Sequence, residues 1–449
     1  MSTRDAIEAY RDLLTGDLAA ESQAQLDDQQ TKRGLRFGER PVCTVLRPRF
    51  FTPSEYGVLK SRVALLLQAF DKALAAALAS TDFRKKFALT DTEEILVGQD
   101  PGFNPSPTGR LDAFWVTEED ALRFNEYNAE TPAGPGYTEA LAEIFMGLPI
   151  TREFSRKFEM RPLFARANVL HALVGSYQKW SGRRDTPRIA IVDWRDVPTA
   201  SEFVLMRDYF VSQGVSTIIA DPEELELEGG RLVRGDFKID LIYKRVLISE
   251  LLDRSGLSHP VVRAVREGRV CMVNPFRCKI LHKKASFAVL SDEENAHLLD
   301  ADERRAIDAH VPWTRLLSER RTMIRGKSID LLPYAAEHRE ELVLKPNDEY
   351  GGKGIRLGWL TPAAEWEAAL RQALEEPHVV QERVRIPEEP YPSFVDGRVE
   401  WTRRMQDTAP FVYYGEYMDG ALTRISTAAL LNVTAGGGST VPTFVVEKR

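Results

Sequence analysis

GRLDAFWVTEEDALRFNEYNAETPAG, residues 109–134, decides the fold because it reads as an antiparallel hairpin with charged side chains on one face. RLDAFW and LRFNEYN are typical of strands, and the polar TEEDA between them favours a turn. Directly opposed residues of an antiparallel pair project from the same face of the sheet. A turn centred on Glu119 therefore places two pairs of side chains together: Asp112 with Glu126, and Arg110 with Asn128.

This arrangement needs a cation, since opposed carboxylates repel each other unless a positive charge lies between them. Oxygen ligands from a few side chains, with room left for substrate phosphates, suit Mg²⁺. The hairpin thus indicates a magnesium site made by Asp112, Glu126 and Asn128. The alternative is a solvated hairpin whose charges all point to water, and the spacing alone does not separate the two interpretations.

A second stretch, ELVLKPNDEYGGKGIRLGWL at 341–360, predicts a glycine-rich hairpin. One strand ends at Lys345, the next begins at Ile355, and the loop between them holds three glycines: Gly351, Gly352 and Gly354. Glycines let backbone N–H groups approach an anion closely. The stretch is not a Walker A loop, because its lysine is followed by Gly, and not a dinucleotide fingerprint, because no helix follows. A loop that closes over phosphates and a plain hairpin turn both remain.

A third stretch, RCKILHKKASFAVLSD at 277–292, brings three lysines to the start of a helical segment: Lys279, Lys283 and Lys284. Such a run is usually a solvated helix face. It becomes a candidate for binding anions only because it accompanies the acidic hairpin and the glycine-rich loop. The sequence does not decide between these interpretations.

Pattern changes divide the chain into four regions. Residues 1–100 are mostly helical, and residues 101–185 hold the acidic hairpin followed by further helices. Residues 186–265 alternate strand and helix (RIAIVDW, SEFVLMRDYFVSQG, VSTIIAD, IDLIYKRV), which predicts a right-handed βαβ unit and a small Rossmann-like domain. Residues 266–449 begin with helices and end in strands. The expected class is mixed α and β (α/β).

The composition is that of a soluble globular protein, with 449 residues, 43% hydrophobic and 28% charged. The formal net charge is −7 with both signs mixed along the chain, so no basic stripe points to nucleic acid. Neither a secretory signal nor an apolar run long enough to span a bilayer is found, which predicts a cytoplasmic protein without a membrane partner. Three scattered cysteines, Cys43, Cys271 and Cys278, are expected to be reduced thiols.

Together these motifs resemble the glutathionylspermidine synthase-type ATP-grasp family from about residue 105 onward. That family carries an Arg-x-Asp strand followed by a Glu-x-Asn strand, as RLD and EYN do here. NPFRCKILHKKA resembles its nucleotide-binding Lys-Ala segment, VLKPNDEYGGKGI its phosphate loop, and EPHVVQERV the strand that contacts adenine. The resemblance covers the synthetase part only. It implies an ATP-grasp fold with an inserted Rossmann-like pre-ATP-grasp domain and a helical N-terminal region.

The resemblance also implies ATP and Mg²⁺ as cofactors, and it assigns roles to the matching positions. Asp112, Glu126 and Asn128 would hold Mg²⁺, and Arg110 would steady the transferred γ-phosphoryl group. The ATP-binding positions would be Lys284, Lys345, Gly351, Gly352, Gly354, Gln381 and Glu382. Backbone groups and one carboxylate of residues 380–382 would receive adenine.

The acid substrate is expected near the Rossmann-like domain, because the pre-ATP-grasp domain helps to bind it in that family. Arg195 and Arg245 are candidates for holding a substrate carboxylate, since arginine can bind it bidentately, although either could instead form a surface ion pair. Asn432, before the glycines of LNVTAGGGSTVPTF, is a candidate for a loop that lines the active site, and Asp407 is another.

The implied activity is that of a carboxylate–amine ligase. ATP would phosphorylate an amino-acid-like or peptide-like acid, and an amine would then attack the acyl phosphate. Two alternatives remain open: an ATP-grasp kinase that stops after phosphoryl transfer, and a nucleotide-binding regulatory protein without turnover. The intact metal ligands argue against the regulatory protein. The partners expected are small-molecule or peptide acid and amine substrates, and neither their identity nor the oligomeric state follows from the sequence.

Overall fold

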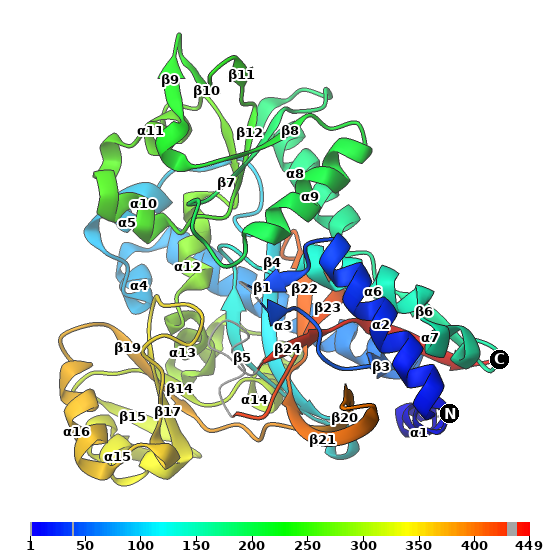
Figure 1. Cartoon of the computed structure of the whole chain (residues 1–449). Coiled ribbons are helices and arrows are strands. Elements are labelled where there is room, and N and C mark those ends of the chain that lie inside the picture. Colours follow the sequence, from blue (N-terminus) through cyan, green and yellow to red (C-terminus); the bar gives the residue numbers. More distant parts are fainter. Residues whose placement is uncertain (1, 38–39, 429–437) are drawn as a thin grey trace.

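The computed structural model of the chain describes residues 2–37, 40–428 and 438–449. Figure 1 shows three regions of sheet: a parallel sheet at the top, a small antiparallel sheet at the lower left, and a larger antiparallel sheet between them. Both termini lie on the right of that view. The acidic hairpin belongs to the larger sheet, so it stands where the other two regions meet.

The larger sheet joins parts of the chain that are far apart in sequence. Its path runs β20-β21-β23-β22-β4-β5, with one further strand, β24, on β23. The bounds are β20 (Glu388–Val395), β21 (Arg398–Gln406), β23 (Tyr417–Ser426), β22 (Ala409–Tyr413), β4 (Thr108–Val116), β5 (Ala121–Asn128) and β24 (Ser439–Val441). Strands β4 and β5 are the two halves of the predicted hairpin.

The predicted register of the hairpin is confirmed. Asp112 pairs with Glu126, and Arg110 pairs with Asn128. The turn is centred half a residue earlier than predicted, since Val116 pairs with Ala121. A register shift after Asp112 restores the predicted pairing.

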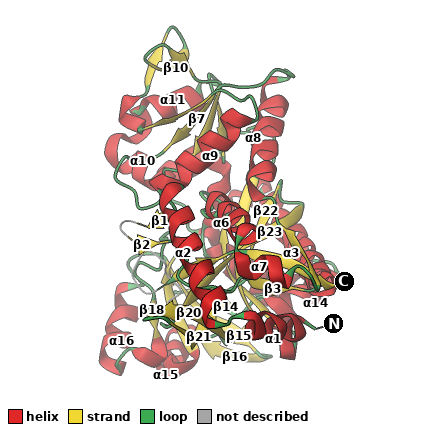
Figure 2. Ribbon diagram, turned by 45° about the vertical axis from the view of Figure 1, so that its right-hand side comes forward, coloured by secondary structure: helices red, strands yellow, loops and turns green. Residues whose placement is uncertain are grey.

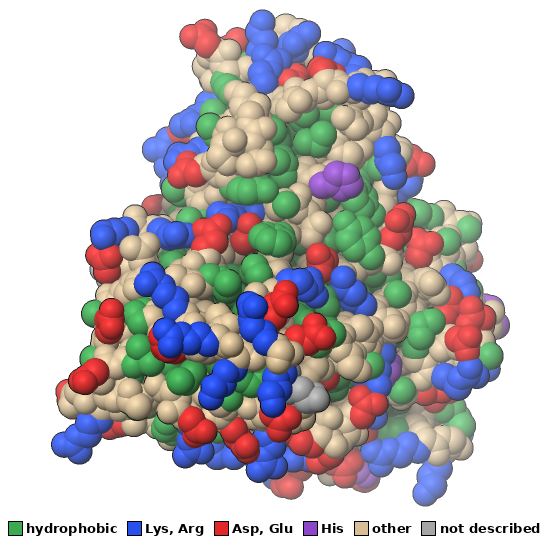
Figure 3. Space-filling model, turned by 90° about the vertical axis from the view of Figure 1, so that its right-hand side faces the viewer, with side chains coloured by type: hydrophobic (Ala, Val, Ile, Leu, Met, Phe, Trp, Pro, Cys, Tyr) green, Lys and Arg blue, Asp and Glu red, His purple; other side chains and the backbone are tan. Residues whose placement is uncertain are grey.

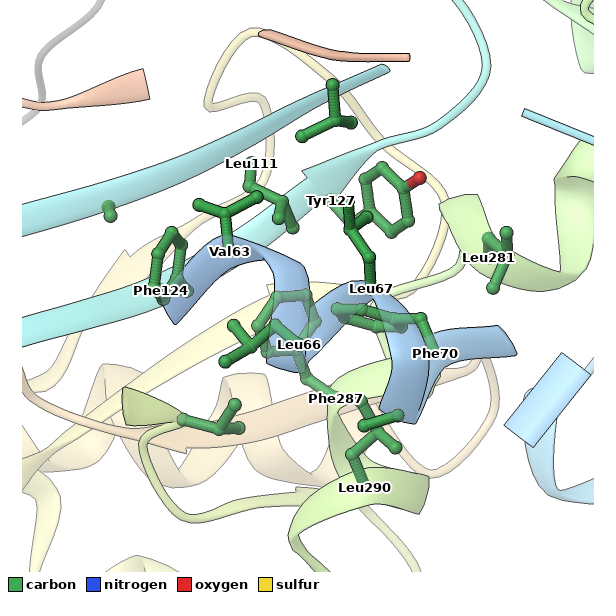
Figure 4. Packing of buried hydrophobic residues seen from close by; sticks show 14 of the residues in the cluster. Val63, Leu66, Leu67, Phe70, Leu111, Phe124, Tyr127, Leu281, Phe287 and Leu290 are labelled. Carbon is green, nitrogen blue, oxygen red and sulfur yellow. The ribbon is translucent and has the colours of Figure 1, made fainter. Parts of the chain in front are cut away.

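The other face of the hairpin packs on helix α3 (Pro53–Ala79), which begins at a capping box formed by Thr52 and Glu55. Figure 4 shows the contact between the helix side chains Val63, Leu66, Leu67 and Phe70 and the hairpin side chains Leu111, Phe124 and Tyr127. Side chains alternate along a strand, so burial of this apolar set turns the charged set to the opposite face.

The parallel sheet has the order β13-β12-β7-β8. Its strands are β7 (Ile189–Val192), β8 (Thr217–Ala220), β12 (Leu241–Lys244) and β13 (Cys271–Val273). Helices α8 (Ala165–Ser181), α9 (Ala200–Ser212), α10 (Ile248–Ser255) and α11 (Pro260–Arg266) accompany it, and a three-stranded sheet of β9 (Glu226–Glu228), β10 (Arg231–Arg234) and β11 (Phe237–Lys238) follows β8. The sheet extends beyond residue 265, where the Rossmann-like region was expected to end, because β13 pairs with β12.

The small antiparallel sheet has the order β14-β19-β17-β18. Its strands are β14 (Thr314–Leu316), β17 (Leu342–Pro346), β18 (Arg356–Leu357) and β19 (His378–Glu382). The same region contains the hairpin β15 (Arg321–Ile324) and β16 (Lys327–Asp330) and the helices α15 (Leu331–Glu337) and α16 (Ala363–Gln372). Strands β17 and β18 flank the glycine-rich loop, as predicted.

The first hundred residues do not form a purely helical region. Strand β3 (Arg49–Phe51) enters a sheet with β25 (Thr443–Lys448) and β6 (Phe158–Pro162), and β1 (Arg36–Phe37) pairs with β2 (Arg40–Pro41). Around them lie α1 (Thr3–Leu13), α2 (Gly16–Lys32), α6 (Pro135–Gly147) and α7 (Pro149–Phe154), which Figure 2 shows beside the central strands. The N-terminal region is therefore built into the same body as the C-terminal strands.

Shorter helices complete the fold. They are α4 (Thr81–Arg84), α5 (Asp91–Val97), α12 (Lys279–His282), α13 (Ala285–Ser291) and α14 (Ala301–His310), with the 3-10 helices η1 (Lys85–Phe87), η2 (Thr117–Glu119), η3 (Pro222–Glu224), η4 (Gly256–Ser258), η5 (Phe276–Cys278), η6 (Glu293–Leu298), η7 (Arg339–Glu341) and η8 (Gly358–Leu360). Among the helices described, none combines the length and apolar character needed to cross a bilayer. The three cysteines are buried free thiols, as expected.

Charges of both signs are interspersed over the face of the molecule shown in Figure 3. Lysine and arginine side chains alternate there with aspartate and glutamate, and apolar side chains lie between them. No single sign of charge therefore dominates this face.

Candidate functional site

A cavity lies between the acidic hairpin and the small antiparallel sheet, and we call it the first cavity. Its polar lining includes Arg110, Asp112, Asn125, Glu126, Asn128, Lys345, Gln381, Glu382, Asp407 and Arg424. Its apolar lining includes Phe114, Val343, Leu357, Trp359, Val384 and Ile386. Gly351 and Gly352 of the glycine-rich loop also border it. The lining thus combines apolar side chains with a large set of charged and amide side chains.

Asp112 is held between two guanidinium groups. Its side chain is 4% exposed. Arg110 donates to it from Nε at 2.6 Å and from Nη2 at 3.0 Å, and Arg424 donates from Nη2 at 2.7 Å. Burial alone would raise the pKa of Asp112, but the two guanidiniums outweigh burial and lower the pKa to about 2. Asp112 is therefore a carboxylate at any pH near neutrality.

Arg424 is a residue that the sequence analysis missed. It lies on β23, three hundred residues from Asp112 along the chain, and no local pattern around it is distinctive. Its Nε donates to Asp407 Oδ2 at 2.6 Å, and its backbone N–H donates to Asp407 Oδ1 at 2.6 Å. Asp407, expected from the sequence as a site candidate, is buried and holds Arg424 against Asp112.

Glu126 lies near two lysines, and one of them, Lys345, lines the first cavity. Lys284 Nζ lies 3.0 Å from Glu126 Oε1 and donates to the carbonyl of Glu349 at 2.5 Å. Lys345 Nζ donates to Gln381 Oε1 at 2.7 Å and to the carbonyl of Asn125 at 3.2 Å. Burial lowers the pKa of Lys345 to about 8, despite the opposing effect of Glu126. The predicted acidic hairpin and the predicted lysines thus meet in space.

Two asparagines of the hairpin leave polar atoms without a partner among the described residues. These atoms are Asn125 Oδ1 and Asn128 Nδ2, both buried at the wall of the first cavity. Asn125 is the extra residue of the bulge, between Phe124 and Glu126 in the pairing. The bulge brings its side chain to the cavity beside Glu126, and the sequence gives no signal for a bulge at this position.

The hairpin therefore brings carboxylate and amide side chains to the wall of the first cavity: Asp112, Glu126, Asn125 and Asn128. Both oxygens of Asp112 also accept from the two guanidiniums. Hard oxygen ligands of this kind fit Mg²⁺. The unpartnered Asn125 Oδ1 supports the fit, because a buried acceptor without a donor is costly unless a ligand satisfies it. The amide of Asn128 can present either its oxygen or its nitrogen by rotation. The donor set agrees with the metal predicted from the sequence.

The glycine-rich loop adopts left-handed backbone angles at all three predicted glycines, with φ of 63° at Gly351, 78° at Gly352 and 72° at Gly354. Gly354 also lies against Pro346, since a Cβ there would meet Pro346 Cγ at 2.7 Å. Gly351 and Gly352 border the first cavity, whereas Gly354 does not line it. Gly354 shapes the turn that carries the other two.

The three lysines at 279, 283 and 284 are not a solvated face, since all are buried. Lys279 Nζ donates to Glu130 at 2.9 Å and to Asp348 at 2.7 Å, and Lys283 Nζ donates to Asp348 at 2.9 Å. Glu130, His282 and Asp348 also place possible ligand atoms within 4.8 Å of one another. The lysine ammonium groups already bind the two carboxylates, so this cluster is an ion-pair network that anchors the loop at Asp348.

Gln381 and Glu382 lie on the central strand of the small sheet. Strand β19 pairs with β14 on one side and with β17 on the other, and the backbone N–H of Glu382 donates to the carbonyl of Trp313 at 2.8 Å. That N–H is engaged within the sheet and is not available to a ligand. The side chains of both residues line the first cavity.

A second cavity adjoins the first and shares Arg110, Asn128, Gly351 and Arg424 with it. It extends from these residues to the parallel sheet, where Asp193, Val197, Arg245, Leu247 and Glu250 line it. Tyr350 of the loop and Tyr137 of α6 also border it. Two cavities thus meet at the pair of guanidiniums that hold Asp112.

The two arginines proposed for carboxylate binding have different environments. Arg245 is buried, lines the second cavity and lies 3.8 Å from Glu202, so it is not a surface ion pair. Arg195 is 70% exposed, is ion-paired with Glu224 and borders neither cavity. The structure therefore does not bring Arg195 to the site. Asn432 lies outside the described residues.

No protein-family model matches the sequence, and no curated protein matches it. Among solved structures, the chain is similar to a glutathione synthetase-like effector from Globodera pallida, with a TM-score of 0.59 and 11% identity. The match covers 96% of this chain and 98% of that chain. At this identity the likeness shows the fold alone, and it shows it over nearly the whole chain.

Two further matches cover 58% of this chain. They are a RimK-domain ATP-grasp protein from Sphaerobacter thermophilus (16% identity, 90% of that chain, TM-score 0.27) and D-alanyl-alanine synthetase A from Vibrio cholerae (9% identity, 88% of that chain, TM-score 0.30). Their TM-scores are too low to carry an argument. The mixed α and β class predicted from the sequence is confirmed, and nothing among these matches singles out the glutathionylspermidine synthase type.

Proposed function

We propose that this chain is an ATP- and Mg²⁺-dependent carboxylate–amine ligase of the ATP-grasp class. The observation that carries the proposal is the convergence of oxygen ligands and lysines at the first cavity. Asp112 and Glu126 line it, Lys345 faces them, and Lys284 pairs with Glu126. A site that gathers both anionic ligands and cationic groups suits a metal–triphosphate complex, which carries both signs of charge.

The lining of the first cavity suits the parts of ATP. Its apolar side chains, among them Val343, Leu357 and Trp359, suit a planar base, and its charged and amide side chains suit the phosphates. Lys284 and Lys345 would bind phosphate oxygens, and Gly351 and Gly352 would bring backbone groups close to them. Mg²⁺ at Asp112, Glu126, Asn125 and Asn128 would supply charge neutralisation on the phosphates.

Transfer of the γ-phosphoryl group would occur where the cavities meet. Arg110 and Arg424 stand at that boundary, and Asp112 fixes both guanidiniums. Phosphoryl transfer depends mainly on positioning and on stabilising charge, so two fixed guanidiniums favour it. The acid substrate would lie in the second cavity with its carboxylate oxygen as nucleophile. The P–O bond to ADP breaks as the acyl phosphate forms.

The amine would then attack the acyl carbon and lose a proton, and phosphate would leave as the C–N bond forms. A cavity that is separate from the nucleotide slot but open to the same guanidiniums gives the acid its own place. This second cavity favours a ligase over a regulatory protein that needs only to bind nucleotide. It does not by itself distinguish a ligase from a kinase.

Hydroxylamine tests the proposal, because it intercepts acyl phosphates to give hydroxamates. The purified chain is incubated with ATP, Mg²⁺, hydroxylamine and a panel of amino acids and dipeptides, and both ADP and hydroxamate are measured. The ligase predicts hydroxamate formation with at least one acid, in step with ADP. ADP formed together with a stable phosphorylated product that hydroxylamine leaves intact would instead identify a kinase.

Variants of the hairpin complete the test. Asp112→Asn and Glu126→Gln should abolish ADP formation while circular dichroism stays native. Glu118→Gln, an exposed glutamate at the turn of the same hairpin, serves as the control and should retain it. Turnover near the wild-type level in both hairpin variants would refute the metal assignment. Nucleotide binding without turnover in the wild-type chain would favour the regulatory protein.

A further inference from the structure

The second cavity opens at a distinctive place in the parallel sheet. Strand β8 lies on one side of β7, and β12 and β13 lie on the other, so the chain reverses its direction of progress between β7 and β12. Ligands of open α/β sheets bind beyond the carboxyl ends of the strands at such a point. Asp193 directly follows β7 and Arg245 directly follows β12, and both line the cavity.

The guanidiniums that line the second cavity already have anionic partners. Arg110 binds Asp112, Arg424 binds Asp407, and Arg245 lies 3.8 Å from Glu202. Arg245 also donates to the carbonyl of Pro132 at 2.6 Å. Bonds within the protein use three of the five side-chain N–H donors of Arg110 and two of those of Arg424, so both guanidiniums keep donors for a ligand.

The acidic side chains of the same cavity lack such partners. Within the described ranges, neither Asp193 nor Glu250 forms an ion pair, and their recorded bonds come from neutral donors. Trp194 donates to Asp193 from its backbone N–H at 2.9 Å and to Glu250 from its indole Nε1 at 3.1 Å. Tyr350 donates to Glu250 at 3.4 Å. Two carboxylates thus converge beside one tryptophan. Arg245 acts on Asp193 at longer range and Arg254 lies over the Trp194 ring, 3.6 Å from its centroid, but in the described part of the chain neither guanidinium forms an ion pair with the two carboxylates.

His282 supplies an independent sign of a ligand. Its side chain is 5% exposed and lines the second cavity, and its Nδ1 has no hydrogen-bond partner among the described residues. Its Nε2 lies 3.7 Å from Glu130 and 3.9 Å from Asp348, which places the ring proton on Nε2. Burial lowers the pKa of His282 to about 4, so the ring is neutral and Nδ1 is an acceptor. Away from the boundary with the first cavity, the second cavity therefore presents hydrogen-bond acceptors, namely Asp193, Glu250 and His282 Nδ1.

We propose that the second cavity binds an acid that carries its own ammonium group, held by Asp193 and Glu250, with its carboxylate at Arg110 and Arg424. An amino acid or the N-terminus of a peptide has this chemistry. The ammonium offers three donors to a region of acceptors, while Asn128 Nδ2 and the guanidiniums face the carboxylate. Tyr137, Val197 and Leu247 give the carbon skeleton an apolar wall. The inference deepens the proposed function, on which it rests for the role of the bound acid.

Binding is tested without turnover, so that the two proposals can fail separately. Saturation-transfer NMR compares dipeptides in three forms: free, N-acetylated, and C-terminally amidated. The free form should bind, and the acetyl and amide forms should each bind roughly ten-fold or more weakly, because hydrogen bonds to charged groups are the strong ones. Equal signals from the free and acetylated forms, or no signal from any free dipeptide, would overturn the proposal.

Variants locate the ammonium site. Asp193→Asn and Glu250→Gln should remove the preference for the free form over the acetylated form while the ATP affinity stays unchanged. Asp196→Asn is the matched control, since it removes the same charge three residues away at an exposed position outside the cavity. A preference that survives both cavity variants would refute the site. Selective binding without ADP formation would leave the site intact and refute the ligase.

Discussion

At the scale of single residues, Lys345 shows how burial prepares a group for an anion. Its side chain is buried, and its hydrogen-bond partners among the described residues are neutral oxygens of Gln381 and Asn125. A buried ammonium without a carboxylate in direct contact carries an unmet charge, which is why its pKa falls to about 8. A phosphate oxygen would restore the charge balance and raise the pKa again.

Lys345→Gln should therefore weaken ATP binding without unfolding the protein. The neutral side chain keeps a polar group near Gln381 but loses the charge, which predicts an affinity for ATP roughly ten- to a hundred-fold lower. Isothermal titration with ATP and Mg²⁺ measures it. Lys327→Gln, an exposed lysine on β16, is the control and should bind ATP as the wild type does. Unchanged affinity in Lys345→Gln would exclude a phosphate contact at this lysine.

Asp193 is a carboxylate whose burial leads to a prediction about folding stability. Burial raises its pKa to about 6, so ionising it in the folded state costs free energy that the unfolded chain does not pay. At pH values between the ordinary pKa of aspartate and about 6, Asp193 is mostly protonated in the folded state and mostly ionised in the unfolded chain. Stability therefore falls as the pH rises through this window.

Asp193→Asn should remove that loss, because an amide does not ionise and its oxygen can still accept from Trp194. The variant should melt at a higher temperature than the wild type at about pH 8 and show little difference at about pH 4, below the window. Thermal unfolding at both pH values measures it. A melting temperature that falls at about pH 8 would contradict the destabilising role of this carboxylate.

Single residues were predicted well only where local pattern fixes their surroundings. Asp112 and Glu126 follow from hairpin spacing, so their pairing was predictable. Arg195 and Arg245 look alike in sequence, since each follows a strand by one to three residues, yet one is exposed and the other lines a cavity. That difference comes from packing against Glu202 on α9, which the local sequence does not encode.

At the scale of elements, the register of the acidic hairpin depends on a bulge that corrects the offset of its turn. Pairing of Val116 with Ala121 alone would set Asp112 opposite Asn125. The bulge inserts Asn125 as an extra residue and returns Glu126 to its place opposite Asp112. The sequence predicted the final register from a turn centred half a residue late, and it could not reveal the bulge or the asparagine oxygen that the bulge brings to the cavity.

The glycine-rich loop gives a prediction at this scale. Gly354→Ala adds a Cβ that would meet Pro346 at 2.7 Å, at a φ of 72° that side chains disfavour. The loop would shift, so the KM for ATP should rise several-fold. The free energy of unfolding should change by about 1–3 kcal/mol. Gly214→Ala, after α9, is the control, because it has φ of 79° and open space around it. A KM unchanged in Gly354→Ala would separate the loop from nucleotide binding.

At the scale of the whole molecule, the site is assembled from distant segments. The hairpin pairs with β22, Arg424 comes from β23, and Lys345 from the small sheet. Sequence resemblance predicted that the hairpin and Lys345 belong together but did not predict Arg424, whereas periodicity predicted only the separate strands. The N-terminal region shows the limit of sequence-based prediction most clearly. It was expected to be helical, yet its strand β3 pairs with β25, some four hundred residues later in the chain.

Glu130 is the point at which these parts are tied together. It is fully buried two residues after β5 and binds Lys244 of the parallel sheet at 3.0 Å, Lys279 of α12 at 2.9 Å and the N–H of Ile248 at 2.6 Å. Burial would raise the pKa of Glu130, but Lys244 and Lys279 outweigh it and hold the pKa well below its ordinary value. Its contribution to stability is therefore present above the ordinary pKa and lost as the pH falls below it.

Glu130→Gln leaves two buried ammonium groups short of a partner, so it should lower the unfolding free energy by about 3–5 kcal/mol near neutral pH. The deficit should shrink as the solution is acidified, because the wild type loses the same contact there. Urea unfolding across this pH range measures it. Glu8→Gln, which breaks an exposed pair with Arg4, should change stability little. In this variant, hydrogen exchange should show β7 and β12 losing protection before β4 and β22, because the parallel sheet loses its tie to the hairpin. Simultaneous loss of protection would mean that other contacts join the parallel sheet to the hairpin.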